Sequence, residues 1–437
     1  MKKQLGKEDA IKTIQTKLMS DGNTNLLFGQ TEDGLIGISH DFRETRRNTN
    51  VLVLSENDNQ IWKRYILPNL LAVHSSAVIV CNETEYAEFD SRYKEQYHQD
   101  HNSSVIRFHS DQTDRYNPIS TTEWKPTLHY LSIAQEADDV FRKNCEKRQI
   151  SDLFQCFTLL KFVLLYVINS AKIPKEEKNF ETVLKVLLDF AELGKDTFES
   201  KIEKYTIEEN RASADNLRLA GYSIINPVAQ GIYGDLRHTG QVFLKDLDTP
   251  YFSIDLLAEK QGYLFIVLPD DSMDSISPYR QETSFFISLL FLDLYAYREY
   301  KWKKVNYSRK AKDHPIVFYL NHAKKYAIPH LAERFATNRN YSIGISLVTD
   351  PEHLQSIYGD NLYTIEACSN TIYFGRAVKS KNVEFMAKII EARLGKKRNP
   401  LRDTQNQYRT YGIKSLPQNK AIISMYAMPH ITCNTLS

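Results

Sequence analysis

The stretch VLVLSENDNQIWKRYILPNL, residues 51–70, has the layout of a phosphate-binding loop: an apolar strand, a turn and a helix. In such loops, glycines let backbone N–H groups surround the phosphates, a lysine reaches the terminal phosphates and a hydroxyl helps to hold Mg²⁺. This stretch has no glycine and no lysine at a usable position, and Glu56 and Asp58 in the turn would repel a triphosphate. Either a nucleotide site has lost its chemistry here, or the stretch is an ordinary strand–helix junction.

Two histidines, His98 and His101, lie with Asp100 in YHQDHNSS and have a spacing that could bind a metal ion. No further group of ligands accompanies them, so a polar loop between a helix and a strand is the favoured interpretation. We therefore predict no metal site in this chain. No GxSxG motif is present either, so we find no case for a covalent mechanism.

The run KWKKVNYSRKAK, residues 301–312, combines six basic residues with Trp302 and Tyr307, a mixture that can contact a nucleic-acid backbone. A solvated surface loop is the competing and favoured interpretation, because 56 basic residues against 54 acidic ones give no overall attraction to nucleic acid. The candidate nucleic-acid contacts are Lys301, Lys303, Lys304, Arg309, Lys310 and Lys312.

The elements that must position these residues alternate between strands and helices. Short apolar, β-rich segments recur along the chain, and helical patterns separate or follow many of them, which predicts a doubly wound, mostly parallel sheet. The Asp33-Gly34 pair within 26–38 predicts a hairpin ahead of this sheet. The expected strands of the sheet are 51–54, 75–80, 104–109, 262–270, 314–321, 341–350 and 370–377.

Between about Thr127 and Asp215 the periodicity is helical and strand signals nearly vanish, which indicates an all-α insertion into the α/β domain. The predicted organisation is an N-terminal segment with a short β hairpin at 1–49, an α/β domain at 50–124 and 245–437, and an all-α insertion domain at 125–244.

Composition is typical of a soluble globular protein, with 437 residues, 42% hydrophobic and 25% charged. The five scattered cysteines lack metal-binding spacing and predict free thiols in a reducing compartment. The N-terminus lacks the apolar core of a signal peptide, and the apolar runs 157–171 and 284–297 are too short to span a bilayer. We therefore expect a cytoplasmic protein.

Taken in order, several short motifs resemble those of the TraG/TraD-type coupling proteins of type IV secretion, the hexameric DNA-pumping ATPases of conjugation. The resemblance extends from about Asn25 to near the end of the chain, and no single motif is specific. It implies a RecA-like P-loop NTPase fold, an α/β sheet with an inserted all-α domain. The motifs that carry it are GQTEDG (29–34), RRNTNVLVL (46–54), Pro68-Asn69-Leu70, Tyr116-Asn117-Pro118, LPDDSMDS (268–275), IVFYLN (316–321), IGISLVTDPEHLQSIYGD (343–360) and TIYFGRA (371–377).

The departures from this family lie where its members bind nucleotide. Aligning Pro68-Asn69 with the family's Pro-Asn places Ser55 and Gln60 at the two loop glycines, Ile61 at the lysine and Trp62 at the hydroxyl residue. Every diagnostic position of the loop is therefore changed.

Other family motifs are lost as well. Asn321 and His322 stand at the strand-end Asp-Glu that organises Mg²⁺ and the attacking water, and Thr349 or Asp350 stands at the sensing Gln. The family's Asp-Pro-Lys-Gly-Glu corresponds to the segment that starts at Cys81. We expect binding of ATP and Mg²⁺ to be lost or weak, no other cofactor, and no ordinary ATP hydrolysis.

The resemblance suggests a catalytically degenerate coupling-protein-like component, structural or regulatory, that recruits DNA or protein substrates. Its expected partners are an active coupling-ATPase paralogue, relaxosome or other type IV secretion proteins, and DNA, in a homo- or hetero-oligomer. Because the family's N-terminal transmembrane helices are missing, partners would have to place this chain at the inner membrane. The alternatives are an active DNA-translocating ATPase with an unorthodox site and a nucleic-acid-binding protein that uses no nucleotide.

Overall fold

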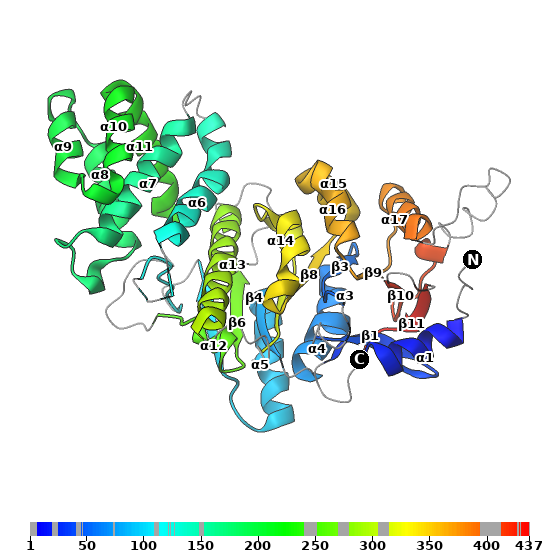
Figure 1. The fold of residues 1–437 in the computed structure, drawn as a ribbon. Coiled ribbons are helices and arrows are strands. Elements are labelled where there is room, and N and C mark those ends of the chain that lie inside the picture. The colour runs from blue at the N-terminus through cyan, green and yellow to red at the C-terminus, as the bar shows by residue number, and fades with distance from the viewer. Residues whose placement is uncertain are drawn as a thin grey trace.

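The computed structural model describes residues 7–19, 25–40, 45, 47–72, 75–108, 113–120, 122, 124–125, 127–147, 153–239, 251–269, 279–304, 314–393, 412–425, 428 and 430–436. Among these residues, eleven strands form one sheet with the order β2-β1-β11-β10-β9-β3-β8-β7-β4-β6-β5 (Figure 1). The strands are β1 (Asn25–Thr31), β2 (Gly34–Ser39), β3 (Val51–Leu54), β4 (Ser76–Asn82), β5 (Ser103–Arg107), β6 (Tyr263–Leu268), β7 (Ile316–Leu320), β8 (Ile343–Thr349), β9 (Thr371–Phe374), β10 (Lys420–Met425) and β11 (Ile431–Asn434).

The middle of the sheet is parallel. β3 pairs with β8 on one side and β9 on the other, and β7 lies between β8 and β4. Parallel strands end at the same edge, so the residues that follow β3, β4, β7 and β8 meet there. Ligands of open α/β sheets bind at this carboxyl edge. The predicted α/β fold class with a mostly parallel sheet is confirmed.

The strand sequences explain why both faces of the parallel region are covered. VLVL, YLFIVL and IVFYL are continuous apolar runs whose residues are all buried, as expected for strands packed on two sides. Alternate residues face opposite layers: Leu52 and Leu54 belong to one hydrophobic core, and Val51 and Val53 to another that includes Trp62.

Helices form both layers. The core that contains Val51 includes residues of α1 (Lys7–Lys17), the helical segment after β3, and α5 (Glu83–Tyr97). The opposite core includes residues of α12 (Asp255–Ala258), α13 (Tyr279–Lys304), α14 (Leu331–Thr337), α15 (Pro351–Tyr358), α16 (Leu362–Ala367) and α17 (Ser380–Arg393).

Between Thr127 and Thr239 the described residues form helices and no strand. These helices gather at one end of the molecule (Figure 1). The bundle shares a hydrophobic core with α13 of the sheet layer. Its helices are α6 (Thr127–Lys147), α7 (Leu153–Asn169), α8 (Phe180–Ala191), α9 (Phe198–Tyr205), α10 (Arg211–Ala220) and α11 (Tyr222–Thr239). Of the two apolar runs noted in the sequence, 157–171 lies mainly in α7 and 284–297 lies in α13. In the described part of the chain, no helix combines the length and apolar character needed to cross a membrane.

The helix that the sequence predicts after β3 is divided into three parts. It begins as α3 (Asp58–Ile61), widens into the short π-helix η1 (Trp62–Ile66) and returns to α-helix in α4 (Leu67–Ala72). The start at Asp58 follows from the Asn57 side chain, which caps the helix by accepting a hydrogen bond from the Gln60 N–H.

The sequence analysis predicts the hairpin of β1 and β2 but not the last two strands, β10 and β11. The hairpin, with Gly34 at φ 121°, joins the main sheet because Gln30 pairs with Asn434 of β11. β11 is only four residues long, and pairs antiparallel with β10, which in turn pairs with β9. Such a short strand owes its conformation to its neighbours and has a weak signal of its own.

Candidate functional site

The loop after β3 closes on itself at the carboxyl edge of the sheet. Ser55 donates its N–H to the carbonyl of Thr349 at 3.1 Å, and its hydroxyl accepts the N–H of Asn57 at 3.2 Å. The Asn57 side chain then accepts the N–H of Gln60 at 2.9 Å. In a phosphate loop, backbone N–H groups at these positions point at the ligand. Here protein oxygens already accept them.

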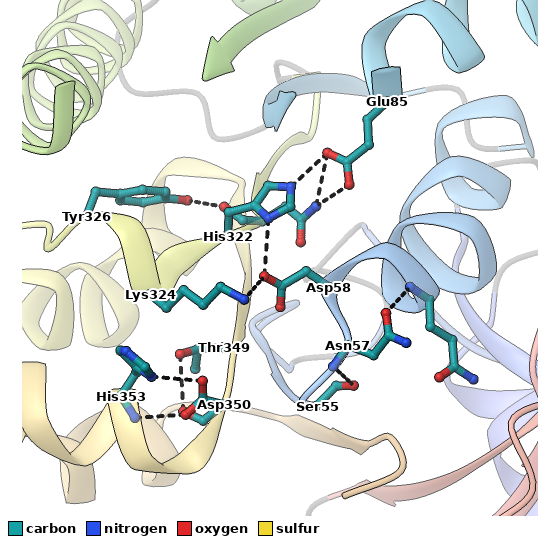
Figure 2. Close-up of polar contacts among 12 residues, drawn as sticks. Ser55, Asn57, Asp58, Glu85, His322, Lys324, Tyr326, Thr349, Asp350 and His353 are labelled. Carbon is teal, nitrogen blue, oxygen red and sulfur yellow. Dashed lines mark hydrogen bonds and ion pairs between the residues drawn. The ribbon is translucent and has the colours of Figure 1, made fainter. Parts of the chain in front are cut away.

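His322 lies just beyond the end of β7 and bridges two acidic side chains from other elements (Figure 2). Its Nδ1 is 3.2 Å from a carboxylate oxygen of Asp58, the first residue of α3, and its Nε2 is 2.9 Å from Glu85 in α5. Lys324 adds a second cation, with its ammonium group 2.8 Å from the same Asp58 oxygen. We call Asp58, Glu85, His322 and Lys324 the edge cluster.

Glu85 is the buried member of the edge cluster that contacts residues at the ends of two strands. One carboxylate oxygen accepts the N–H of Asn82 at 3.0 Å, while Asn82 in turn accepts the N–H of Glu85, so the two residues form a capping box at the start of α5. The side-chain amide of Asn321 donates to Glu85 at 3.2 Å. Glu85 thus joins the ends of β4 and β7.

Contacts within the edge cluster shift the pKa values of Asp58 and His322. Burial acts to raise the pKa of Asp58, but hydrogen bonds and charges from His322 and Lys324 outweigh it and hold that pKa below its usual value. Burial likewise acts to lower the pKa of His322, and its contacts with Asp58 and Glu85 outweigh burial and raise it. The contact between Asp58 and His322 therefore favours the charged form of each.

Ile61 and Trp62, which the resemblance aligns with the family's lysine and hydroxyl residue, are core residues. Their exposed fractions are 2% and 0%, and both belong to the hydrophobic layer beneath the sheet. The indole N–H of Trp62 donates to Glu88 of α5 at 3.1 Å. Ile61 has no polar side-chain group, and the indole N–H of Trp62 is engaged by Glu88. Their burial favours core side chains that fill this space over side chains that face a ligand.

The other sequence candidates divide between this edge and its surroundings. Thr349 ends β8, and the following Asp350 caps α15, accepting the N–H of His353 at 2.9 Å. Cys81 is buried inside β4, where burial raises the pKa of its thiol well above the usual value. Gln60 turns away from the edge cluster and donates its side-chain amide to the carbonyl of Gln418.

Three members of the edge cluster were not among the sequence candidates. Asp58 was noted only as a repulsive charge, Glu85 only as part of a lost motif, and Lys324 not at all. The available signal was complementary charge: acids follow β3 and β4, and His322 and Lys324 follow β7, whose carboxyl end lies at the same edge.

The basic run and the histidine pair do not join this site. Lys301 makes an ion pair with Glu259 at 3.2 Å, Lys303 and Lys304 lie in the last turn of α13, and Arg309, Lys310 and Lys312 fall outside the described residues. His98 ends α5 with φ 53°, whereas His101 contacts Asp90 at 3.0 Å among aromatic rings. Within the described residues, no three His, Cys, Asp or Glu side chains are grouped to hold a metal ion.

No protein-family model and no curated protein matches this sequence. Its structure, however, is similar to that of the bacterial conjugative coupling protein TrwB. The unbound form aligns with a TM-score of 0.56 and 12% identity, over 98% of this chain and 91% of that one. The complex with ADP and Mg²⁺ aligns with a TM-score of 0.55 and 10% identity, over 99% and 92%. The chain therefore has the RecA-like fold of the conjugative coupling protein, which is the fold that its resemblance to the TraG/TraD-type proteins implied.

Proposed function

We propose that this chain is a coupling-protein-like component of a conjugative type IV secretion system that works without hydrolysing ATP. The observation that carries the proposal is the edge cluster. Its acidic and basic side chains pair with one another where a coupling ATPase would hold phosphates and Mg²⁺. The coupling-protein fold over nearly the whole chain supports the system to which we assign it.

The chemistry of the edge does not fit Mg-ATP. A phosphate loop presents a lysine and free N–H groups to the phosphates, and an acid to the metal. Here Ile61 and Trp62 are buried, both carboxylates are engaged by His322, and Lys324 is paired with Asp58. Binding a triphosphate would require breaking buried ion pairs, at a cost of about 3–5 kcal/mol when one partner is left uncompensated.

In this proposal the chain acts as a structural, regulatory or adaptor subunit that helps to recruit DNA or protein substrates. Binding of ATP and Mg²⁺ is lost or weak, and an active coupling ATPase supplies the energy for transfer. Mixed oligomers with that ATPase, or contacts with relaxosome proteins, would place the chain at the inner face of the membrane.

The direct test is ATP turnover by the purified full chain, with and without single-stranded DNA, together with calorimetry of ATP binding in Mg²⁺ and in EDTA. We expect no turnover above a blank and no gain in affinity from Mg²⁺. DNA-stimulated turnover that disappears in Asn321→Ala or His322→Ala would overturn the proposal, since it would show that the edge is catalytic.

A second test addresses the proposed partner by co-purification of this chain with an active coupling ATPase of the same secretion system. We expect a stable mixed complex whose ATPase activity is set by the active subunit and does not change when Asp58→Ala alters the edge cluster here. An effect of this variant on turnover would show that the present chain contributes to hydrolysis.

A further inference from the structure

A polar pocket of about 200 Å³ lies beside the loop, lined by residues that do not belong to the edge cluster. Its lining comes from the loop, from the helical segment after it and from the residues just before β10. The lining residues are Asn57, Asn59, Gln60, Lys63, Arg64 and Gln418.

The pocket and the protein interior contact opposite faces of the helical segment after β3. Asp58, Ile61, Trp62 and Tyr65 are buried, whereas Asn59, Gln60, Lys63 and Arg64 are exposed or half-buried and recur three or four residues apart. The segment 58–66 therefore has an inner face that packs under the sheet and an outer face that lines the pocket. The hydrogen bond from Gln60 to the Gln418 carbonyl joins the two sides of the pocket.

The lining is cationic. The described lining residues supply an ammonium group, a guanidinium group and four carboxamides, and none of them is a carboxylate. Arg64 is held in place because one of its nitrogens donates to the Thr435 hydroxyl at 2.9 Å, and no other described residue accepts a hydrogen bond from its guanidinium group. The described residues place no carboxylate in ion-pair contact with Lys63 or Arg64, unlike Lys324 on the inner side.

We propose that this pocket binds the phosphate group of an anionic ligand without a metal ion. A guanidinium fork and an ammonium group are the side chains that recognise phosphate, and carboxamides supply further N–H donors. The volume is below the range of about 300–1,000 Å³ usual for drug-sized ligands, so it suits a phosphate or diphosphate rather than a whole nucleotide. The inference does not rest on the proposed function.

The test is calorimetry of inorganic pyrophosphate binding to the full chain, with Lys63→Ala and Arg64→Ala as the altered proteins. Lys63 is exposed, so its truncation leaves the core intact. We expect binding that persists in EDTA, weakens as salt rises from about 50 to about 200 mM, and falls about tenfold or more in each variant. The matched control is Lys175→Ala, an exposed lysine in the helical bundle, which should bind like the wild type.

Competition then identifies the source of the phosphate. Displacement of pyrophosphate by a small phosphomonoester such as phosphoserine indicates a free phosphomonoester, and displacement by a thymidine oligonucleotide indicates a nucleic-acid backbone. Absence of pyrophosphate binding, or equal binding by wild type and Lys63→Ala, would overturn the proposal. Mg²⁺-dependent ATP turnover would count against the proposed function alone, because this pocket requires no metal.

Discussion

Two buried groups of charged residues can be compared: the edge cluster at the carboxyl edge of the sheet, and a second group where the helical bundle meets α13. In the second group, which we call the joint cluster, Asp293 lies 3.0 Å from Lys125 and 2.6 Å from His129, and accepts the hydroxyl of Tyr116. In both clusters, carboxylates pair with basic side chains from a distant part of the sequence.

They differ in their access to water. In the joint cluster the side chains of Asp293, Lys125 and His129 are 2%, 1% and 4% exposed, whereas Lys324 in the edge cluster is 38% exposed. Burial lowers the pKa of Lys125 although Asp293 acts to raise it, while the pKa of Asp293 is held low against burial by Lys125 and His129. A sealed cluster of this kind fixes how two layers pack. The edge cluster, by contrast, leaves the Lys324 side chain in contact with water.

The largest effect is expected from Asp293→Ala. The substitution leaves Lys125 buried without its carboxylate partner and takes an acceptor from Tyr116, which should lower the free energy of unfolding by about 3–5 kcal/mol. Urea denaturation followed by circular dichroism measures it. Glu181→Ala is the control, because Glu181 pairs with Lys185 on the surface and its loss should cost less than about 1 kcal/mol. An equal decrease in the free energy of unfolding in both variants would show that burial of the ion pair makes no difference to its contribution.

The next effect concerns the bridge between Glu85 and His322. A double-mutant cycle with Glu85→Gln and His322→Gln should give a coupling energy of about 1–3 kcal/mol, because the pair is buried and charge-assisted. The measurement is again urea denaturation of the two single variants and the double variant. Additive single effects would show that His322 does not hold the ends of β4 and β7 together.

A smaller effect is a pH dependence that belongs to the edge cluster. The pKa of His322 is raised in the folded protein, so its stabilising contribution is complete below about pH 6.5, the ordinary value, and is lost as pH rises through the raised pKa. Asp58 has a lowered pKa, and its contribution is lost in the opposite direction, as pH falls below about 4.

The pH effect is measured as the stability of the wild type minus that of His322→Gln. This difference should decline from about pH 6 to higher pH. Other titrating histidines, such as His40, whose pKa burial lowers to about 4, are present in both proteins and cancel. A difference that grows with rising pH would show that His322 is buried in its neutral form.

The smallest effect is expected from Lys324→Ala, at about 0–1 kcal/mol, because its side chain is 38% exposed and water screens the pair with Asp58. Thermal unfolding at low and high salt measures it, and the difference from wild type should shrink at high salt. A loss of stability as large as that of Asp293→Ala would mean that water does not screen the Lys324–Asp58 pair and that the two clusters are equally buried.

Much of the architecture could be predicted from local patterns. Continuous apolar runs such as VLVL and IVFYL are typical of strands that a parallel sheet buries on both faces, and strand signals nearly vanish in the helical period after Thr127. The short terminal strands were missed because strand pairing, rather than local preference, stabilises them. The start of α3 at Asp58 depends on the cap supplied by Asn57.

At the candidate site the sequence determined which chemistry is absent, since the stretch after β3 has Ser55, Gln60, Ile61 and Trp62 and lacks the glycines and the lysine of a phosphate loop. Only the tertiary structure decided which charged side chains meet there. Asp58 and His322 are 264 residues apart, and they meet because β3 and β7 end at the same edge of a parallel sheet with β8 between them. Which charges neutralise one another is a property of that strand order, and local sequence does not encode it.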